Sequence, residues 1–295
     1  MGAEDTDCHS TRGLIRLHHH SEFPLELLLE RKREPVTVVL PTREVVDTIG
    51  RIVERLQGLG GLVDQVLVVD SASEDGTADI AAGLGAEVHQ EADLMPQLGP
   101  VLGKGDAMYR ALSVTRGELI AYIDSDTRRF SSHFATGMLG PLVTGSTRFV
   151  KGAFRRPFAT AGGAELPADG GRVTELMARP LLRAFHPELA GFAQPLAGEV
   201  AARRELFDRL PFATGYAVEM AMLLDAHELL GGTDGMAEVD LDVRRNRHKP
   251  LAELGPMADE VLSVVRERLQ RDGRLLDAGR PVVVRQPFAS LRVAA

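Results

Sequence analysis

The sequence predicts an α/β fold built around a mostly parallel sheet. Through residues 36–123, short apolar runs alternate with segments of helical spacing, and a polar or glycine-rich turn follows most of the runs. Runs that are apolar at nearly every position indicate strands buried on both faces, as in parallel sheets. The 295 residues are 44% hydrophobic and 26% charged, which is enough to build a complete globular core.

The individual elements follow from the spacing of apolar residues and from the turn residues that bound them. We expect strands at residues 36–40, 65–69, 87–89, 118–123 and 281–284. We expect helices at residues 23–31, 47–59, 78–84 and 106–115, and helical segments within 211–230 and 257–269. Pro24 stands near the start of the first helix, where proline is favoured, and this helix is expected to pack on the sheet as an N-terminal arm.

Composition limits the function classes. The formal net charge of −8 argues against a general nucleic-acid binder, which needs a basic surface. Cys8 is the single cysteine, so a disulfide framework is excluded and a reducing compartment fits. The sequence shows no apolar run as long as a membrane span and no charged-then-apolar leader, so we expect a cytoplasmic protein without a membrane partner.

The tract His18-His19-His20 closes a polar N-terminal stretch. Three consecutive histidines on an extended tail cannot all face one ion. We therefore expect a solvated turn or a tag-like tail here rather than a metal site.

The triplet Asp124-Ser125-Asp126 follows the apolar run that ends at Ile123. Side chains alternate along a strand, so both carboxylates leave on one side and Ser125 on the other. Mg²⁺ or Mn²⁺ takes a few carboxylate oxygens and fills its other positions with water and substrate phosphate. The alternative is an ordinary solvated loop in a chain with 42 acidic residues. The position after a buried strand favours an enzyme of nucleotide-activated substrates.

Two other turns carry candidate ligand groups. Asp70 and Ser71 follow the second strand, where Asp70 can accept hydrogen bonds from a uracil or a ribose, while the following Asp75-Gly76-Thr77 is interpreted as turn and cap chemistry. Gly103-Lys104-Gly105 precedes a helix, so its glycines let the backbone approach a ligand and its lysine offers a point charge to a diphosphate. It lacks the spacing of a P-loop.

The order of these motifs, with Pro41 after the first strand, resembles the nucleotide-binding half of a GT-A glycosyltransferase. The second half is similar to glucosyl-3-phosphoglycerate synthases, which are retaining GT-A enzymes of the family 81 type, and the similarity covers about residues 18–262. The motifs that carry it are Gly140-Pro141-Leu142, Val150-Lys151, Arg155-Arg156-Pro157, Gly170-Gly171-Arg172-Val173-Thr174-Glu175-Leu176, Ala178-Arg179-Pro180-Leu181-Leu182, Gln194-Pro195-Leu196-Ala197-Gly198-Glu199 and Gly215-Tyr216-Ala217-Val218-Glu219.

The resemblance implies a GT-A fold with a C-terminal acceptor-binding, helical part. It divides the chain into an N-terminal tail and arm helix (1–34), a nucleotide-sugar half (35–130), an acceptor half of the same domain (131–270) and a C-terminal tail (271–295). It also implies transfer of glucose from UDP-glucose, or from GDP-glucose, to the 2-hydroxyl of 3-phosphoglycerate, with Mg²⁺ or Mn²⁺, retention of configuration and a homodimer. Two alternatives stay open: a mannosyl enzyme that uses GDP-mannose, and a catalytically silent domain that binds sugar nucleotides.

The resemblance also assigns residues. The catalytic candidates are Asp126, Lys104 and Glu219. The sugar-nucleotide candidates are Pro41, Thr42, Glu44, Asp70, Ser71, Lys104, Asp124, Ser125, Asp126, Glu199 and Tyr216. The acceptor candidates are Lys151, Gly171, Arg172 and Thr174. An acceptor with a phosphate and a carboxylate needs such donors, and an arginine beside backbone amides at a helix start supplies them.

The predicted metal ligands are Asp126 and His248. The resemblance implies the last aspartate of the triplet and a histidine from a C-terminal loop, but Asn246 stands at the histidine position and His248 follows two residues later. Because a shift of two on an extended loop keeps a side chain on the same face, His248 is our candidate and Asn246 the alternative. Two catalytic mechanisms are compatible with the sequence. One is a front-face reaction, and the other is a double displacement in which Glu199 or Glu219 is the nucleophile.

Overall fold

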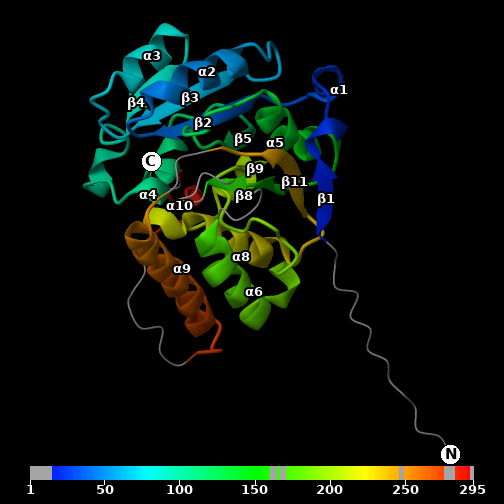
Figure 1. Ribbon diagram of the computed structural model, residues 1–295, viewed down its shortest axis with the longest axis vertical. Helices are drawn as coiled ribbons and strands as arrows, with labels where there is room; N and C mark the ends of the chain where they lie inside the picture. The colour runs from blue at the N-terminus through cyan, green and yellow to red at the C-terminus, as the bar shows by residue number, and fades with distance from the viewer. Residues whose placement is uncertain (1–14, 160–164, 167–170, 246–248, 276–282, 293–295) are drawn as a thin grey trace, which may run out of the picture.

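The computed structural model describes residues 15–159, 165–166, 171–245, 249–275 and 283–292. Its centre is an eight-stranded sheet with the strand order β1-β11-β6-β9-β5-β2-β3-β4 (Figure 1). Neighbouring strands are parallel, except that β9 runs antiparallel to both β5 and β6. The strands of this sheet are β1 (Arg16–His19), β2 (Val36–Thr42), β3 (Gln65–Asp70), β4 (Glu87–Gln90), β5 (Leu119–Tyr122), β6 (Phe149–Arg155), β9 (Val200–Arg203) and β11 (Met236–Val243).

Helices cover both faces of the sheet, and each face has its own apolar core. One core includes residues of α1 (Leu25–Arg31), α2 (Val46–Gln57), α3 (Thr77–Gly83) and α5 (His133–Thr144). The other includes residues of α4 (Lys104–Ala111), α6 (Arg179–Phe185), α7 (Arg204–Phe207), α8 (Val218–Leu230) and α9 (Leu251–Arg271). None of the helices in the described ranges combines the length and the apolar character that a membrane span requires.

Short elements complete the fold. These are the strands β7 (Phe158–Ala159), β8 (Glu165–Leu166), β10 (Phe212–Ala213) and β12 (Val284–Arg285), the helix α10 (Ala289–Arg292), the 3₁₀-helices η1 (His20–Glu22), η2 (Pro96–Leu98), η4 (Pro187–Leu189) and η5 (Gly215–Ala217), and the π-helix η3 (Thr174–Ala178).

The predicted α/β fold with a mostly parallel sheet is confirmed, and most element ends agree within two residues. Helix α9 is longer than expected because it begins at Leu251. The histidine tract was interpreted wrongly: His18 and His19 belong to the edge strand β1, which pairs with β11. Of the predicted strand 281–284, residues 281–282 lie outside the described ranges.

Parallel pairing brings three chain segments to one edge of the sheet. Thr42 at the end of β2 lies opposite Asp70 at the end of β3, and Val39 lies opposite Tyr122 of β5. The Ser125 hydroxyl donates to the Pro41 carbonyl at 2.6 Å, which ties the aspartate triplet to the turn after β2. Ligands of open α/β sheets bind at this carboxyl edge.

The C-terminal residues brace helix α4. Strand β12 pairs with β10, and the Arg285 guanidinium lies 2.5 Å and 2.8 Å from the two carboxylate oxygens of Asp106 in the first turn of α4. The Phe288 ring packs edge-on against Tyr109 of the same helix, with 5.4 Å between ring centroids. The start of α4, where Lys104 stands, is therefore held by Arg285, which lies 179 residues beyond Asp106 in the chain.

Candidate active site

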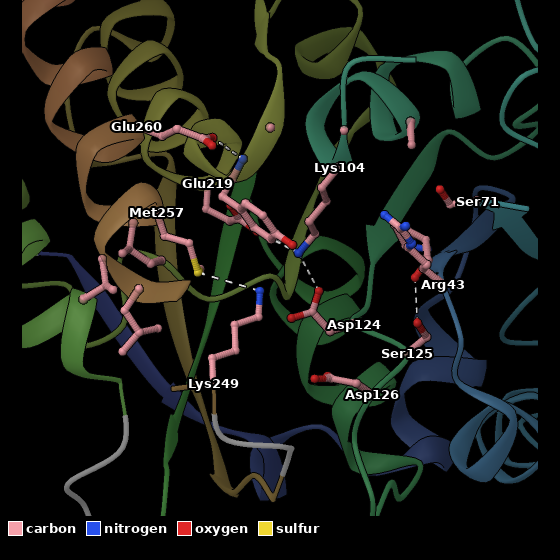
Figure 2. Close-up of a pocket in the computed structure, with 18 of the residues that line it drawn as sticks. Arg43, Ser71, Lys104, Asp124, Ser125, Asp126, Glu219, Lys249, Met257 and Glu260 are labelled. Atoms are coloured by element: carbon pink, nitrogen blue, oxygen red, sulfur yellow. Dashed lines mark hydrogen bonds and ion pairs between the residues drawn. The ribbon is translucent and has the colours of Figure 1, made fainter. Parts of the chain in front are cut away.

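A pocket of about 600 Å³ opens at the carboxyl edge of the sheet and extends to helix α9. In Figure 2, Arg43 and Ser71 lie to one side of a central pair formed by Lys104 and Asp124, and Lys249 and Met257 lie to the other. The predicted residues that line it are Pro41, Thr42, Ser71, Lys104, Asp124, Ser125, Asp126, Gly171, Arg172, Thr174, Tyr216 and Glu219. The volume suits an organic ligand of moderate size.

Lys104 joins two carboxylates at the centre of the pocket. Its Nζ lies 2.6 Å from Oδ1 of Asp124 and 2.7 Å from Oε1 of Glu219 (Figure 2). Burial alone would lower the pKa of Lys104, but the two carboxylates outweigh it and raise that pKa, so the amine is charged. The structure thus brings together three residues that are 20 and 115 positions apart in sequence.

Two glycines make this packing feasible. A Cβ at Gly198 would lie only 2.2 Å from Oδ1 of Asp124, so a side chain there would displace the aspartate. A Cβ at Gly105 would lie 2.0 Å from the Ala213 carbonyl oxygen. Gly105 therefore serves the close packing of α4 on β10, whereas we had expected it to admit a ligand.

Arg244 is the central residue that the sequence analysis missed. Its Nη2 lies 2.9 Å from Asp124 and 2.6 Å from Asp126, and its Nη1 lies 3.1 Å from Glu199. Burial opposes the charge, but Arg244 and Lys104 hold the pKa of Asp124 well below its usual range. Arg244 directly follows β11, a strand that the apolar pattern does not predict.

We call Asp124, Asp126, Glu199, Glu219, Lys104 and Arg244 the carboxylate network. Four carboxylates face two cations, so the network carries excess formal negative charge. Asp126 is its most open member, with 45% of its side chain exposed. Carboxylate oxygens beside a pocket fit a hard divalent cation, and Asp126 is placed to offer one. The other candidate ligands, His248 and Asn246, lie outside the described residues.

Glu199 occupies a different place from the one predicted. Its side chain is fully buried and does not line the pocket, so it has no surface for a sugar. Oε2 accepts from Arg244, and Oε1 has no hydrogen-bond partner among the described residues. Burial raises the pKa of Glu199 against the pull of Arg244. Glu199 is therefore a buried partner of the Arg244 guanidinium and not a sugar contact.

Asp70, a predicted nucleotide contact, is also fully buried and does not line the pocket. Its carboxylate accepts from the Thr42 hydroxyl at 3.0 Å, from the Ser73 hydroxyl at 2.7 Å and from Gln90 at 3.1 Å. These neighbours use its hydrogen-bonding capacity. Asp70 therefore fixes the turns after β2 and β3 and leaves contact with a ligand to its neighbour Ser71.

Glu44 likewise does not line the pocket. It has a left-handed backbone with a φ of 51°, and its carboxylate accepts from the backbone N–H of Glu74 at 2.9 Å. Arg43 lines the pocket beside Ser71, and the Ser71 hydroxyl donates to Glu91 at 2.6 Å. Arg43 and Glu91 thus place charged groups beside Ser71 in the pocket wall. The sequence pattern did not single out either residue.

A basic group, which we define as Arg156, Arg172 and Lys249, lines the pocket together with all members of the carboxylate network except Glu199. Arg172 donates to the backbone carbonyl of Lys249 at 2.6 Å, and the Lys249 amine lies 4.2 Å from the centre of the Tyr216 ring. The Nε of Arg156 is buried without a hydrogen-bond partner among the described residues. Such a donor in a pocket wall is suited to an anion.

Lys151, a predicted acceptor contact, lies away from this group. The side chain is fully buried in β6, does not line the pocket and donates to the Ala197 carbonyl at 2.5 Å. Burial lowers the pKa of Lys151 to about 8. Its role in the structure is to hold the segment that carries Gly198 and Glu199.

The chain is similar to known glycosyltransferases. Residues 37–169 match the model of the family Glycosyl transferase family 2. The glucosyl-3-phosphoglycerate synthase of Mycolicibacterium smegmatis is 44% identical over 79% of this chain and 77% of its own. That of Petrotoga mobilis is 38% identical over 89% and 83%, respectively.

Solved structures of the same kind of enzyme are also similar to this chain. Mannosyl-3-phosphoglycerate synthase from Rubrobacter xylanophilus superposes with a TM-score of 0.86 at 44% identity, covering 94% of this chain and 97% of that one. Glucosyl-3-phosphoglycerate synthase from Mycobacterium tuberculosis in complex with Mn²⁺, UDP-glucose and phosphoglyceric acid superposes with a TM-score of 0.82 at 37% identity, covering 94% and 99%. With relatives this similar over most of its length, the chain belongs to the glucosyl-3-phosphoglycerate synthase family.

Proposed function

We propose that the protein transfers glucose from UDP-glucose to the 2-hydroxyl of 3-phosphoglycerate, with retention of configuration and with Mg²⁺ or Mn²⁺. The observation that carries the proposal is one pocket lined by both a carboxylate network and a basic group. The network suits the cation and diphosphate of a sugar nucleotide, and the basic group suits a doubly anionic acceptor. The M. tuberculosis relative, solved with Mn²⁺, UDP-glucose and phosphoglyceric acid, supports the same pairing.

On the donor side, Asp126 would hold the metal ion, with Asp124 fixed behind it by Lys104 and Arg244. A bound Mg²⁺ or Mn²⁺ supplies electrostatic stabilisation of the leaving diphosphate. The charged amine of Lys104 faces the pocket next to it and would bind a diphosphate oxygen. Pro41, Thr42 and Ser71 line the adjoining wall and would contact the nucleoside.

On the acceptor side, the carboxylate and phosphate of 3-phosphoglycerate would bind Arg172 and Arg156. Gly171 and Thr174 line the pocket beside Arg172, where the π-helix η3 starts. Lys249 and Tyr216 would close this side. A planar guanidinium makes two parallel hydrogen bonds to a carboxylate or phosphate, which fixes the orientation of the 2-hydroxyl.

The placement of the glutamates favours the front-face route. Glu199 has no pocket surface, and Glu219 is bound to Lys104 at 2.7 Å. In this route the bond between the anomeric carbon and the diphosphate breaks as the acceptor oxygen bonds to the same face, and the acceptor proton passes to a diphosphate oxygen. Glu219 would keep Lys104 in place. Glu219→Gln should keep measurable turnover, and a covalent glycosyl adduct on the wild-type protein would instead establish double displacement.

The test is an assay of purified protein with 3-phosphoglycerate and UDP-glucose, GDP-glucose or GDP-mannose, with and without Mg²⁺ or Mn²⁺. We expect metal-dependent UDP release with glucosyl-3-phosphoglycerate as the product. No nucleotide release with any pair would overturn the proposal and leave the silent binding domain. Preferential turnover of GDP-mannose would support the second candidate, a mannosyl enzyme, which the similarity to the R. xylanophilus structure motivates.

The domain division belongs to the same proposal. Residues 35–130 would bind the donor, because they supply Lys104 and the aspartate triplet, and residues 131–270 would bind the acceptor, because they supply the basic group. The described parts of the two tails would brace these halves, since β1 pairs with β11 and β12 pairs with β10. We also propose a cytoplasmic location, where charged nucleotide sugars are made. We further propose a homodimer, which light scattering of the purified chain tests.

A further inference from the structure

A second cluster of ligand-type side chains lies away from the pocket, where the N-terminal edge strand meets β11. The Nε2 atoms of His19 and His20 lie 3.5 Å and 2.7 Å from the two carboxylate oxygens of Asp242. One ligand atom from each of the three residues lies within 4.8 Å of the other two. His19 and His20 come from the end of β1 and the start of η1, and Asp242 comes from β11.

The backbone at Asp242 is held in a costly conformation that aims this carboxylate. Its φ is 65°, a left-handed value that favours glycine or asparagine, and the pairing of β11 with β6 shifts register between Asp240 and Val243. The Asp242 N–H donates to the Asp240 carboxylate at 2.8 Å. Strained, non-glycine residues of this kind concentrate where side-chain direction matters.

The two imidazoles are also positioned by neighbours. The Nδ1 of His19 lies 2.7 Å from the Ser21 hydroxyl and 3.3 Å from the Ser21 backbone nitrogen, so Ser21 fixes this ring on the side opposite Asp242. The His20 ring stacks on His133 with 4.2 Å between centroids. Arg155 also contacts Asp242, at 3.1 Å, but 59% of its side chain is exposed and it is free to turn into solvent.

We propose that His19, His20 and Asp242 form a binding site for a divalent first-row transition ion of the Zn²⁺ type. Two imidazole nitrogens and one carboxylate oxygen are ligands that Zn²⁺ prefers, and they leave a position for water. Mg²⁺, which prefers oxygen ligands, would select the pocket instead. The ion would link the end of β1 and the start of η1 to β11, the strand that directly precedes Arg244. This site is independent of the proposed function.

The experiment is a calorimetric titration of Zn²⁺ into the full chain carrying Asp126→Ala, which removes the pocket aspartate. We expect one bound Zn²⁺ per chain. Adding Asp242→Asn should weaken binding at least about tenfold, because it removes a charged ligand while asparagine tolerates the left-handed backbone. His20→Gln should do the same. His89→Ala, which removes a histidine outside the cluster, is the matched control and should leave binding unchanged.

A spectroscopic readout complements the titration. Co²⁺ bound to this ligand set should give visible absorption bands that disappear in Asp242→Asn, and circular dichroism checks that this variant is folded. Zn²⁺ affinity and Co²⁺ bands that survive in both Asp242→Asn and His20→Gln would place the ion elsewhere and overturn the proposal. Absence of Zn²⁺ binding to the Asp126→Ala chain would overturn it as well. Neither readout depends on transferase activity.

Discussion

The carboxylate network and the basic group share one pocket but are built differently. In the network, Lys104 and Arg244 are each bound to at least two carboxylates, so its geometry is fixed before any ligand arrives. In the basic group, the Nε of Arg156 has no hydrogen-bond partner among the described residues. The network thus contributes to both fold and chemistry, whereas the basic group retains hydrogen-bonding capacity for a ligand. Substitutions in the two should separate stability from binding.

The largest effect is expected for Asp126→Asn. Loss of the exposed carboxylate should lower kcat by about 10³-fold, because the metal-assisted stabilisation of the leaving group is lost. Since Asp126 is half exposed, the unfolding free energy should change by less than about 1 kcal/mol. Steady-state kinetics and urea unfolding measure the two quantities. Asp79→Asn on the surface is the control, and a kcat within tenfold of wild type would remove the metal role.

Lys104→Met should affect activity and stability together. It leaves Asp124 and Glu219 without their shared cation, so we expect a fall in kcat of about 10²-fold and a loss of about 3 kcal/mol in unfolding free energy. Lys104→Arg, which keeps the charge, should recover most of the stability. An unchanged urea midpoint in Lys104→Met would contradict the view of the network as a structural unit.

Arg156→Gln should act on binding alone. Losing a charged hydrogen bond to the acceptor is worth about 1.5–3 kcal/mol, so the KM for 3-phosphoglycerate should rise by about 10–100-fold. The KM for the sugar nucleotide should stay the same, and Arg172→Ala should behave likewise. Arg155→Gln, next in sequence but exposed, is the matched control. A selective rise in the KM for the sugar nucleotide would assign these arginines to the diphosphate.

The smallest effect on turnover is expected at Lys151, whose contribution is to the pH dependence of stability. Burial lowers its pKa from 10.5 to about 8, so between these values the unfolded chain binds more protons than the folded one. The unfolding free energy therefore gains up to about 3 kcal/mol as the pH rises through this window. Lys151→Met should lack this rise, so the difference in unfolding free energy between the two proteins, measured by urea unfolding, should change with pH between 7 and 10.5. An identical pH profile would show that the lysine is solvated.

The sequence predicted the parts of the molecule that depend on local pattern. Apolar runs gave β2, β3 and β5, and the motif order gave the pairing of Lys104 with the aspartate triplet in one pocket. Asp70 was misplaced because a strand-end position does not reveal that Thr42 and Ser73 already satisfy its carboxylate. Lys151 was misplaced because β6 is a central strand covered on both faces, which its basic neighbourhood in sequence conceals.

Arg244 could not be found by pattern at all. It meets Asp124 and Asp126 about 120 residues away, through the crossing of β11 to the far side of the sheet, and no local spacing encodes that contact. The same is true of the Asp242 carboxylate and the two histidines, which are more than 220 residues apart. The histidine tract resembles an isolated tail in sequence, and only the pairing of β1 with β11 brings it to Asp242.

The brace between Arg285 and Asp106 has a consequence for synthesis of the chain. On a ribosome, Lys104 and Asp124 emerge early and can pair, but Asp124 gains its second cation only when residue 244 is made, and Asp106 gains Arg285 only when residue 285 is made. The nascent nucleotide-binding half therefore lacks Arg244 and the brace on α4 for much of its synthesis. Chains that stop before residue 244 should fold in part without acquiring activity.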